Sequence, residues 1–177
     1  MIINRNLLFN LAPIKNMTQE KKKSWGVSYG MSEAGYDIRI AEDIIFSPGE
    51  QKWWKLWGVE PFIIRYDKNA EWPDPKIPGR FCLASTLEEF QMPTNLTGIV
   101  HDKSTWARRG LSVYNTVIEP GWAGFLTLEL SFSGEEPLTI PAGAGIAQVI
   151  FHQTAKHAAY NGKYQNAKAG PQKAILE

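Results

Sequence analysis

Apolar and polar residues alternate along several short segments of the chain, and this period of two predicts β-strands. The clearest alternation runs from residue 126 to residue 133, where even-numbered positions are Leu or Phe and odd-numbered positions are Thr, Glu or Ser. Because successive side chains of a strand point to opposite faces, the even positions form a core face, and Glu129 lies on the other face. The predicted strands are Gly35–Ile40, Phe81–Leu83, Leu96–Val100, Leu111–Val117, Phe125–Ser133, Pro137–Ile140 and Ile146–Phe151.

Turns that contain glycine or proline separate the later strands, for example at residues 119–121 and 141–143. The segment Lys103–Arg109 predicts a short helix with Asp102 or Ser104 as its N-cap and Gly110 just past its end. The segment Thr86–Phe90 predicts a turn or short helix. Together these patterns predict a mostly β fold, a barrel or sandwich of short antiparallel strands with one or two short helices.

The length of 177 residues fits a single domain with a separate tail. We expect residues 1–153 to form the domain, including a polar, lysine-rich lead-in over residues 1–24. Residues 154–177 are rich in Ala, Lys, Asn, Gln and Gly and cannot bury much surface by themselves. This composition predicts a flexible C-terminal lid that is either disordered or ordered by a ligand.

Composition narrows the choice of partners. The net charge of +1 argues against nucleic acid, which needs a strongly basic face, but leaves open a local basic site for a small anion. Nothing in the sequence resembles a signal peptide or a membrane span, so we expect no membrane partner and a cytoplasmic protein. We expect the single cysteine, Cys82, to be a buried, unreactive thiol. One cysteine can form neither an internal disulfide nor a multi-thiolate zinc site.

An aromatic cluster and a loop complete the pattern before residue 81. For Trp53, Trp54 and Trp57, packing in the core or between subunits is favoured over stacking on bases. Residues 67–80 contain three prolines and predict a loop.

Two segments carry candidate chemistry. On the predicted helix, Ser104 and Arg108 are four residues apart and share a face, as do Thr105 and Arg109, so the segment is either an anion site or a capped surface helix. Glu129 lies in the middle of a strand, where it is either solvated or placed in a site. A lone strand glutamate is usually solvated, so neither segment decides the function by itself.

Six segments occur in an order that is typical of one family. They are Tyr36–Arg39, Lys103–Arg108, Ile118–Trp122, Thr127–Leu130, Gly145–Gln148 and Gly162–Gln165, the last followed by Gly170 and Pro171. On these residues the chain resembles the dCTP deaminase branch of the deoxyuridine triphosphatase (dUTPase) superfamily. Zinc-dependent deaminases need a set of Cys and His ligands that one cysteine cannot supply.

The resemblance implies a homotrimer with active sites between subunits, which deaminates dCTP to dUTP and ammonia in pyrimidine deoxynucleotide metabolism. It implies that Glu129 activates the water that attacks cytosine C4 and carries the proton toward ammonia, and that Ser104 and Arg108 orient the site and contact phosphate. It implies Mg²⁺ bound through the triphosphate, no zinc, and dTTP as a candidate inhibitor. The residues assigned to substrate binding are Lys103, Thr105, Asn115, Thr116, Val117, Ile118, Glu119, Trp122, Gln148, Tyr160, Lys163, Tyr164 and Gln165.

Three departures from the family pattern stand out. Glu119 replaces an aspartate that activates the hydrolytic water in dUTPases. The interval that precedes this turn is about two residues shorter than deaminases have, which leaves Asn115 or Thr116 as the residue that faces the cytosine amino group. Gln165 is a weak substitute for a glutamine that contacts phosphate.

These departures keep three other functions open. A bifunctional enzyme would deaminate dCTP and hydrolyse the dUTP to dUMP and pyrophosphate. A plain dUTPase is disfavoured because Glu129 would then have no chemical role. A catalytically silent nucleotide-binding module is disfavoured because Ser104, Arg108 and Glu129 are all retained.

Overall fold

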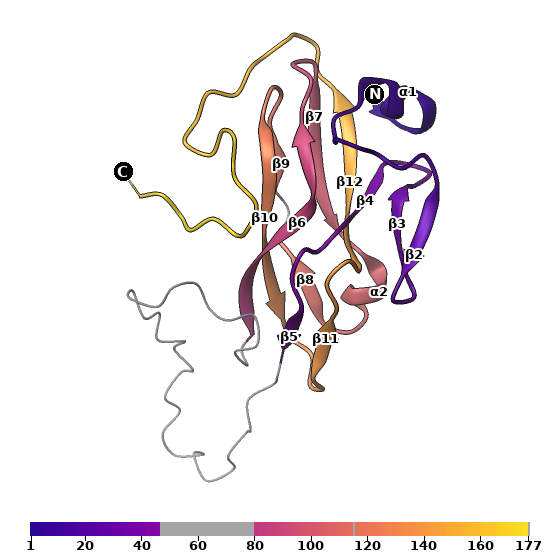
Figure 1. Cartoon of the computed structure of the whole chain (residues 1–177), viewed down its shortest axis with the longest axis vertical. Coiled ribbons are helices and arrows are strands. Elements are labelled where there is room, and N and C mark those ends of the chain that lie inside the picture. The colour runs from indigo at the N-terminus through magenta and orange to yellow at the C-terminus, as the bar shows by residue number, and fades with distance from the viewer. Residues whose placement is uncertain (47–79, 115, 177) are drawn as a thin grey trace.

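A computed structural model describes residues 1–46, 80–114 and 116–176 of the chain (Figure 1). Its elements, in chain order, are β1 (Ile2–Ile3), α1 (Arg5–Leu11), β2 (Lys21–Ser24), β3 (Val27–Met31), β4 (Tyr36–Arg39), β5 (Ile44–Phe46), β6 (Phe81–Gln91), β7 (Leu96–Asp102), α2 (Ser104–Ala107), β8 (Leu111–Val113), β9 (Val117–Ile118), β10 (Ala123–Phe132), β11 (Leu138–Ile140) and β12 (Gly145–Gln153). The tryptophan cluster, the predicted loop up to residue 79 and Asn115 lie outside the described residues.

The strands form three antiparallel sheets. The largest has the order β2-β3-β4-β12-β7-β9, and β1 also pairs with β12. The second has the order β6-β10-β8, and β11 pairs with β5 in the third. The prediction of a mostly β fold of antiparallel strands with one or two short helices is therefore confirmed, and the helices number two among the described residues.

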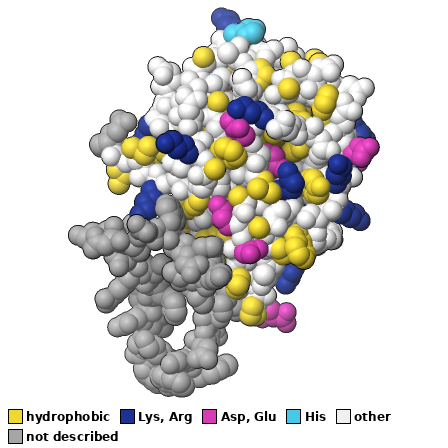
Figure 2. All heavy atoms as spheres, in the orientation of Figure 1, with side chains coloured by type: hydrophobic (Ala, Val, Ile, Leu, Met, Phe, Trp, Pro, Cys, Tyr) yellow, Lys and Arg dark blue, Asp and Glu magenta, His cyan; other side chains and the backbone are white. Residues whose placement is uncertain are grey.

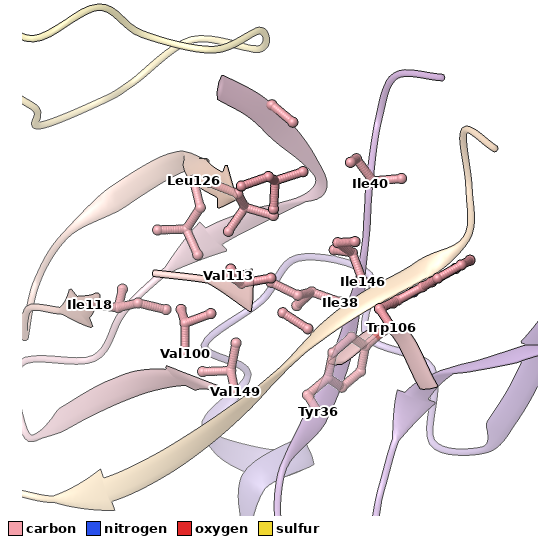
Figure 3. Close-up of a cluster of buried hydrophobic side chains, with 14 of the residues drawn as sticks. Tyr36, Ile38, Ile40, Val100, Trp106, Val113, Ile118, Leu126, Ile146 and Val149 are labelled. Carbon is pink, nitrogen blue, oxygen red and sulfur yellow. The ribbon is translucent and has the colours of Figure 1, made fainter. Parts of the chain in front are cut away.

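One hydrophobic core joins the two larger sheets. The labelled side chains of Figure 3 come from both: Val113 and Leu126 from the three-stranded sheet, and Ile38, Val100 and Val149 from the largest. Burial alternates along the whole of β10, which confirms the predicted core face and leaves Glu129 on the opposite face. Full burial of a large apolar side chain stabilises the fold by about 1.5–3 kcal/mol, so this face holds β10 firmly in place.

The prediction of a turn or short helix over Thr86–Phe90 is wrong, because these residues belong to the long strand β6. β6 pairs with β10 along its length. The register of this pairing shifts between Phe125 and Thr127. At this point the N–H of Leu126 bonds the Thr86 hydroxyl oxygen at 3.0 Å. An ordinary amphipathic strand buries its apolar side chains and exposes its charged ones. Here Leu87 is exposed and Glu88 is buried.

Two other segments differ from their predictions, and a third contains elements that its sequence did not predict. The predicted strand Leu111–Val117 is divided, since β8 joins the three-stranded sheet and β9 joins β7. The N-terminal lead-in contains two strands and α1. The N-cap of α2 is Lys103, without a side-chain bond, and Asp102 instead accepts a bond from the N–H of Val113 at 2.7 Å.

The last segment, residues 154–176, returns along the body of the fold and passes beside the start of β10 (Figure 1). Within the described residues, no helix is long and apolar enough to cross a membrane. Figure 2 shows Lys and Arg side chains scattered over the visible face among Asp and Glu, without a continuous basic stripe.

Candidate active site

Glu129 lies at the centre of the three-stranded sheet, on the face turned away from the core. It pairs with Leu83 of β6, and its carbonyl oxygen accepts a bond from the N–H of Tyr114 at 2.9 Å. The side chain is half-buried, and this burial raises the pKa of Glu129 above the ordinary value of a glutamate. No ion pair joins its carboxylate to any residue that the structure describes. Such a carboxylate can take up and release a proton closer to neutral pH than an exposed glutamate can.

Helix α2 presents Ser104 and Thr105 to solvent, and its C-cap residue, Arg108, is exposed beside them. Trp106 is the residue that anchors the helix: it is buried, and its Nε1 donates to the carbonyl oxygen of Gly145 at 2.7 Å. Because α2 is fixed at this point, its hydroxyls and guanidinium form an exposed cationic face. Within the described part of the chain, neither Ser104 nor Arg108 forms a hydrogen bond or ion pair with Glu129.

Lys103 and Gln148 both contact Asp37, at the place where β4, β12 and α2 meet. The Lys103 Nζ lies 2.5 Å from Asp37 Oδ2, and the Gln148 Nε2 donates to Asp37 Oδ1 at 3.2 Å. The hydroxyl of Ser28 also donates to Asp37 Oδ2 at 2.9 Å, and Gln148 donates to the hydroxyl of Ser32 at 2.8 Å. The Lys103 side chain is 11% exposed and the Asp37 side chain 2%, so this lysine is engaged in a buried pair.

The residues predicted to hold the base and sugar lie in and just before the turn that follows β9. They fall into a buried group and a more exposed group. Ile118 and Trp122 are buried, and the Trp122 ring packs 6.1 Å from the ring of Phe90. Val117 and Glu119 are exposed, and Thr116 is partly buried, with its carbonyl oxygen bonded to the N–H of Val100 at 3.1 Å. The side chains of Ile118 and Trp122 therefore support the turn. The side chains of Thr116, Val117 and Glu119 can reach a ligand.

The predicted lid residues contact the body and one another. The carbonyl oxygen of Tyr164 accepts a bond from Trp122 Nε1 at 2.7 Å, and the Tyr164 hydroxyl accepts one from the N–H of Ile175 at 3.0 Å. The Lys163 Nζ donates to the carbonyl oxygen of Ile175 and lies 5.6 Å from the centre of the Tyr164 ring. The N–H of Tyr160 bonds the carbonyl oxygen of Pro120 at 2.8 Å. The tail is thus folded onto its own chain, and its function as a lid stays a prediction.

Sequence reasoning missed several polar residues beside these groups. Asp37 belongs to a segment used for the resemblance, and its position between Tyr36 and Ile38 in a strand is the same signal that marked Glu129. Thr127 and Ser85 lie beside Glu129 and bond to the tail, and no sequence signal points to those contacts. Among the described residues, no group of three or more His, Cys, Asp or Glu side chains could hold a metal ion.

The fold is that of the dUTPases. The structure resembles the dUTPase of Staphylococcus bacteriophage 80alpha, solved with dUpNHpp, at a TM-score of 0.50 and 14% sequence identity, over 84% of this chain and 91% of that chain. This likeness defines the architecture, and the sequence comparisons then define the family within it.

A family model described as dCTP deaminase-like matches residues 77–154. The dCTP deaminase of Protochlamydia amoebophila is 40% identical over 146 residues, which cover 78% of this chain and 76% of that protein. The dCTP deaminase of Roseiflexus castenholzii is 36% identical over 160 residues, which cover 86% and 85% respectively. The chain belongs to the dCTP deaminase family.

Proposed function

We propose that the protein deaminates dCTP to dUTP and ammonia, with Glu129 as the general base and proton carrier. The observation that carries this proposal is the half-buried Glu129 on the outer face of β10, whose pKa is raised by burial. The similarity to curated dCTP deaminases over most of the chain supports the choice of substrate.

The reaction needs one group that moves a proton twice. The Glu129 carboxylate accepts a proton from water while the water oxygen adds to C4 of cytosine. This proton passes to N3 of the ring. The carboxylate then takes the proton of the new C4 hydroxyl and gives it to the amino group, the C4–N bond breaks, and ammonia leaves while C4 keeps the oxygen as a carbonyl. A positioned carboxylate of this kind typically contributes about 10² to 10⁴ in rate.

Ser104 and Arg108 supply the cationic half of the proposed site, and Thr105 lies beside them on the same exposed helix. A guanidinium and hydroxyls suit the oxygens of a triphosphate. Mg²⁺ would be held by the triphosphate oxygens, which is its usual arrangement in nucleotide sites and needs no cage of protein carboxylates. Lys103 and Gln148 are better placed to support α2 through Asp37 than to contact phosphate directly.

We assign the two halves of the site to different subunits of a homotrimer. In one chain the groups on α2 make no bond to Glu129 within the described residues, so a second copy would bring Ser104 and Arg108 to it. Mixing tests this arrangement: Glu129→Gln and Arg108→Ala proteins, each inactive alone, are unfolded together and refolded. If each site draws the two residues from different chains, about a quarter of the sites regain both. Absence of any regained activity would place both residues in one chain.

The bifunctional enzyme is the second candidate. The dUTPase-like fold and the exposed carboxylate of Glu119, in the turn where dUTPases carry their catalytic aspartate, favour it. Incubation with dCTP and, separately, with dUTP in the presence of Mg²⁺ distinguishes the functions. Ammonia and dUTP indicate the deaminase, and ammonia with dUMP and pyrophosphate indicates the bifunctional enzyme. Pyrophosphate from dUTP alone indicates a plain dUTPase, and the absence of any product a silent binding module.

A further inference from the structure

The tail is attached to the turn that precedes β10 by backbone and side-chain hydrogen bonds, and the side chain of Gln165 forms two of them. Its Oε1 accepts a bond from the N–H of Ala123 at 2.9 Å, and its Nε2 donates to the carbonyl oxygen of Gly121 at 2.9 Å. The Trp122 Nε1 bond to Tyr164 lies next to it. Backbone bonds then continue the contact, from the N–H of Asn166 to the Ala123 oxygen at 2.9 Å.

The body of the fold is shaped to receive this segment. Gly124 has φ 135°, and a Cβ placed there would lie 2.6 Å from the backbone N and O of Ala167. At Gly121, φ is 76° and a Cβ would lie 3.0 Å from Cα of Ala159. Both positions need glycine for their backbone conformation and for the close approach of the tail. The docked tail is therefore part of the packing of the chain.

The end of the tail lies beside Glu129. The N–H of Gly170 bonds the Ser85 hydroxyl oxygen at 3.3 Å, and the N–H of Gln172 bonds the Thr127 hydroxyl oxygen at 2.8 Å. Ser85 pairs with Thr127 across the two strands. Thr127 and Glu129 are two residues apart on one face of β10, about 7 Å along the strand. Residues 170–172 thus cover the surface next to the carboxylate.

We infer that Gln165 is a positioning residue that fastens the tail to its own chain, and so keeps residues 170–172 in place as a cover beside Glu129. The resemblance assigns Gln165 to phosphate binding, but both polar atoms of its amide are already used by the turn. The effect on catalysis rests on the proposed function of Glu129, whereas the fastening itself does not.

Hydrogen exchange of the full-length protein without nucleotide tests the fastening directly. Gln165→Ala removes the two hydrogen bonds to the turn, so we expect the amides of Asn166, Gly170 and Gln172 to exchange about tenfold to thirtyfold faster than in the unaltered protein. Asn161→Ala is the matched control, because Asn161 is an exposed residue of the same tail, and it leaves the rates unchanged. Unchanged rates in Gln165→Ala would overturn the inference, whether or not the protein proves to be a deaminase.

A second variant separates the two ends of the contact. Thr127→Val keeps the shape of the side chain and removes the acceptor of the Gln172 N–H. We expect faster exchange at Gln172 with little change at Asn166. Equal acceleration at both amides would show that the tail opens as one unit and would overturn the assignment of a separate fastening at Gln165.

The pH profile of kcat/KM with dCTP then links the tail to Glu129. Loss of the cover exposes the carboxylate and moves the acidic limb of Gln165→Ala to lower pH, since exposure lowers a pKa that burial had raised. The titratable groups around this face are Tyr114, which follows β8 and whose N–H bonds the Glu129 carbonyl oxygen, and Glu42, whose carboxylate accepts the N–H of Ser85 at 2.9 Å. In the tail, Lys173 follows Gln172. A higher KM with an unmoved acidic limb would make Gln165 a phosphate contact and contradict the positioning function.

Discussion

The buried ion pair between Arg39 and Glu88 gives the most direct test of the fold around β6. The two oxygens of Glu88 accept bonds from Arg39 Nε at 2.8 Å and from the N–H of Arg39 at 2.7 Å. The Glu88 side chain is 3% exposed and the Arg39 side chain 32%. Burial raises the pKa of Glu88, although the bonds from Arg39 oppose this shift. The pair joins β4 of the largest sheet to β6 of the three-stranded sheet.

Glu88→Ala removes one partner of this pair. Breaking a buried ion pair costs about 3–5 kcal/mol, and we take the lower end, about 3 kcal/mol, because water can reach the guanidinium that remains. For a chain of this size, such a loss lowers the Tm by roughly 6–12 °C. Urea unfolding at one fixed protein concentration, followed by tryptophan fluorescence, measures the loss without the concentration dependence that an oligomer would introduce.

Glu89→Ala is the matched control, because the neighbouring glutamate points to the other face of β6. Its side chain is 37% exposed and pairs with Lys15 at 2.5 Å, and a surface ion pair of this kind contributes about 0–1 kcal/mol. We therefore expect a change of less than about 1 kcal/mol. Similar losses in the two variants, or a loss below about 1 kcal/mol in Glu88→Ala, would refute the reasoning, since residues 88 and 89 would then not face opposite sides of a strand.

Three further predictions follow from the burial of single groups. Because burial raises the pKa of Glu129 and the proposed mechanism needs the carboxylate, we expect activity to be lost as the pH falls through a value above that of an ordinary glutamate; an acidic limb of kcat/KM at the ordinary value would contradict this. Burial raises the pKa of Cys82 to about 12, so iodoacetamide should modify it only after unfolding, and rapid labelling of the folded protein would count against the prediction. Lys103→Met leaves Asp37 without its cation and should lower the free energy of unfolding by about 3 kcal/mol, against less than about 0.5 kcal/mol for the exposed Lys22→Met; equal effects would show that the pair is unimportant.

Regular alternation allowed much of the fold to be predicted from sequence. Residues 126–132 alternate without exception, so the strand, its core face and the outward position of Glu129 all followed from the period of two. The same reasoning failed for Thr86–Phe90, because Leu87 points outward while Glu88 is buried against Arg39. The partner of Glu88 is 49 residues away in the chain, and no local pattern can reveal it.

In the candidate site, too, local sequence patterns could not reveal contacts between residues that are far apart in the chain. The exposed face of α2 followed from its spacing, but the position of Lys103 depends on Asp37, which is 66 residues distant. The composition of residues 154–177 indicated that this segment cannot bury much surface by itself. It could not show that backbone bonds and the amide of Gln165, with glycines at positions 121 and 124, would attach this segment to the body.

The rate of ammonia release from dCTP by Glu129→Gln tests the central claim most directly. The amide keeps the shape of the side chain but cannot accept a proton from water. We expect release to fall by at least about 10²-fold, while the affinity for dCTP, measured by equilibrium binding, changes little. Turnover near that of the unaltered protein, or a parallel loss of binding and turnover, would contradict the assignment of Glu129 as the proton carrier.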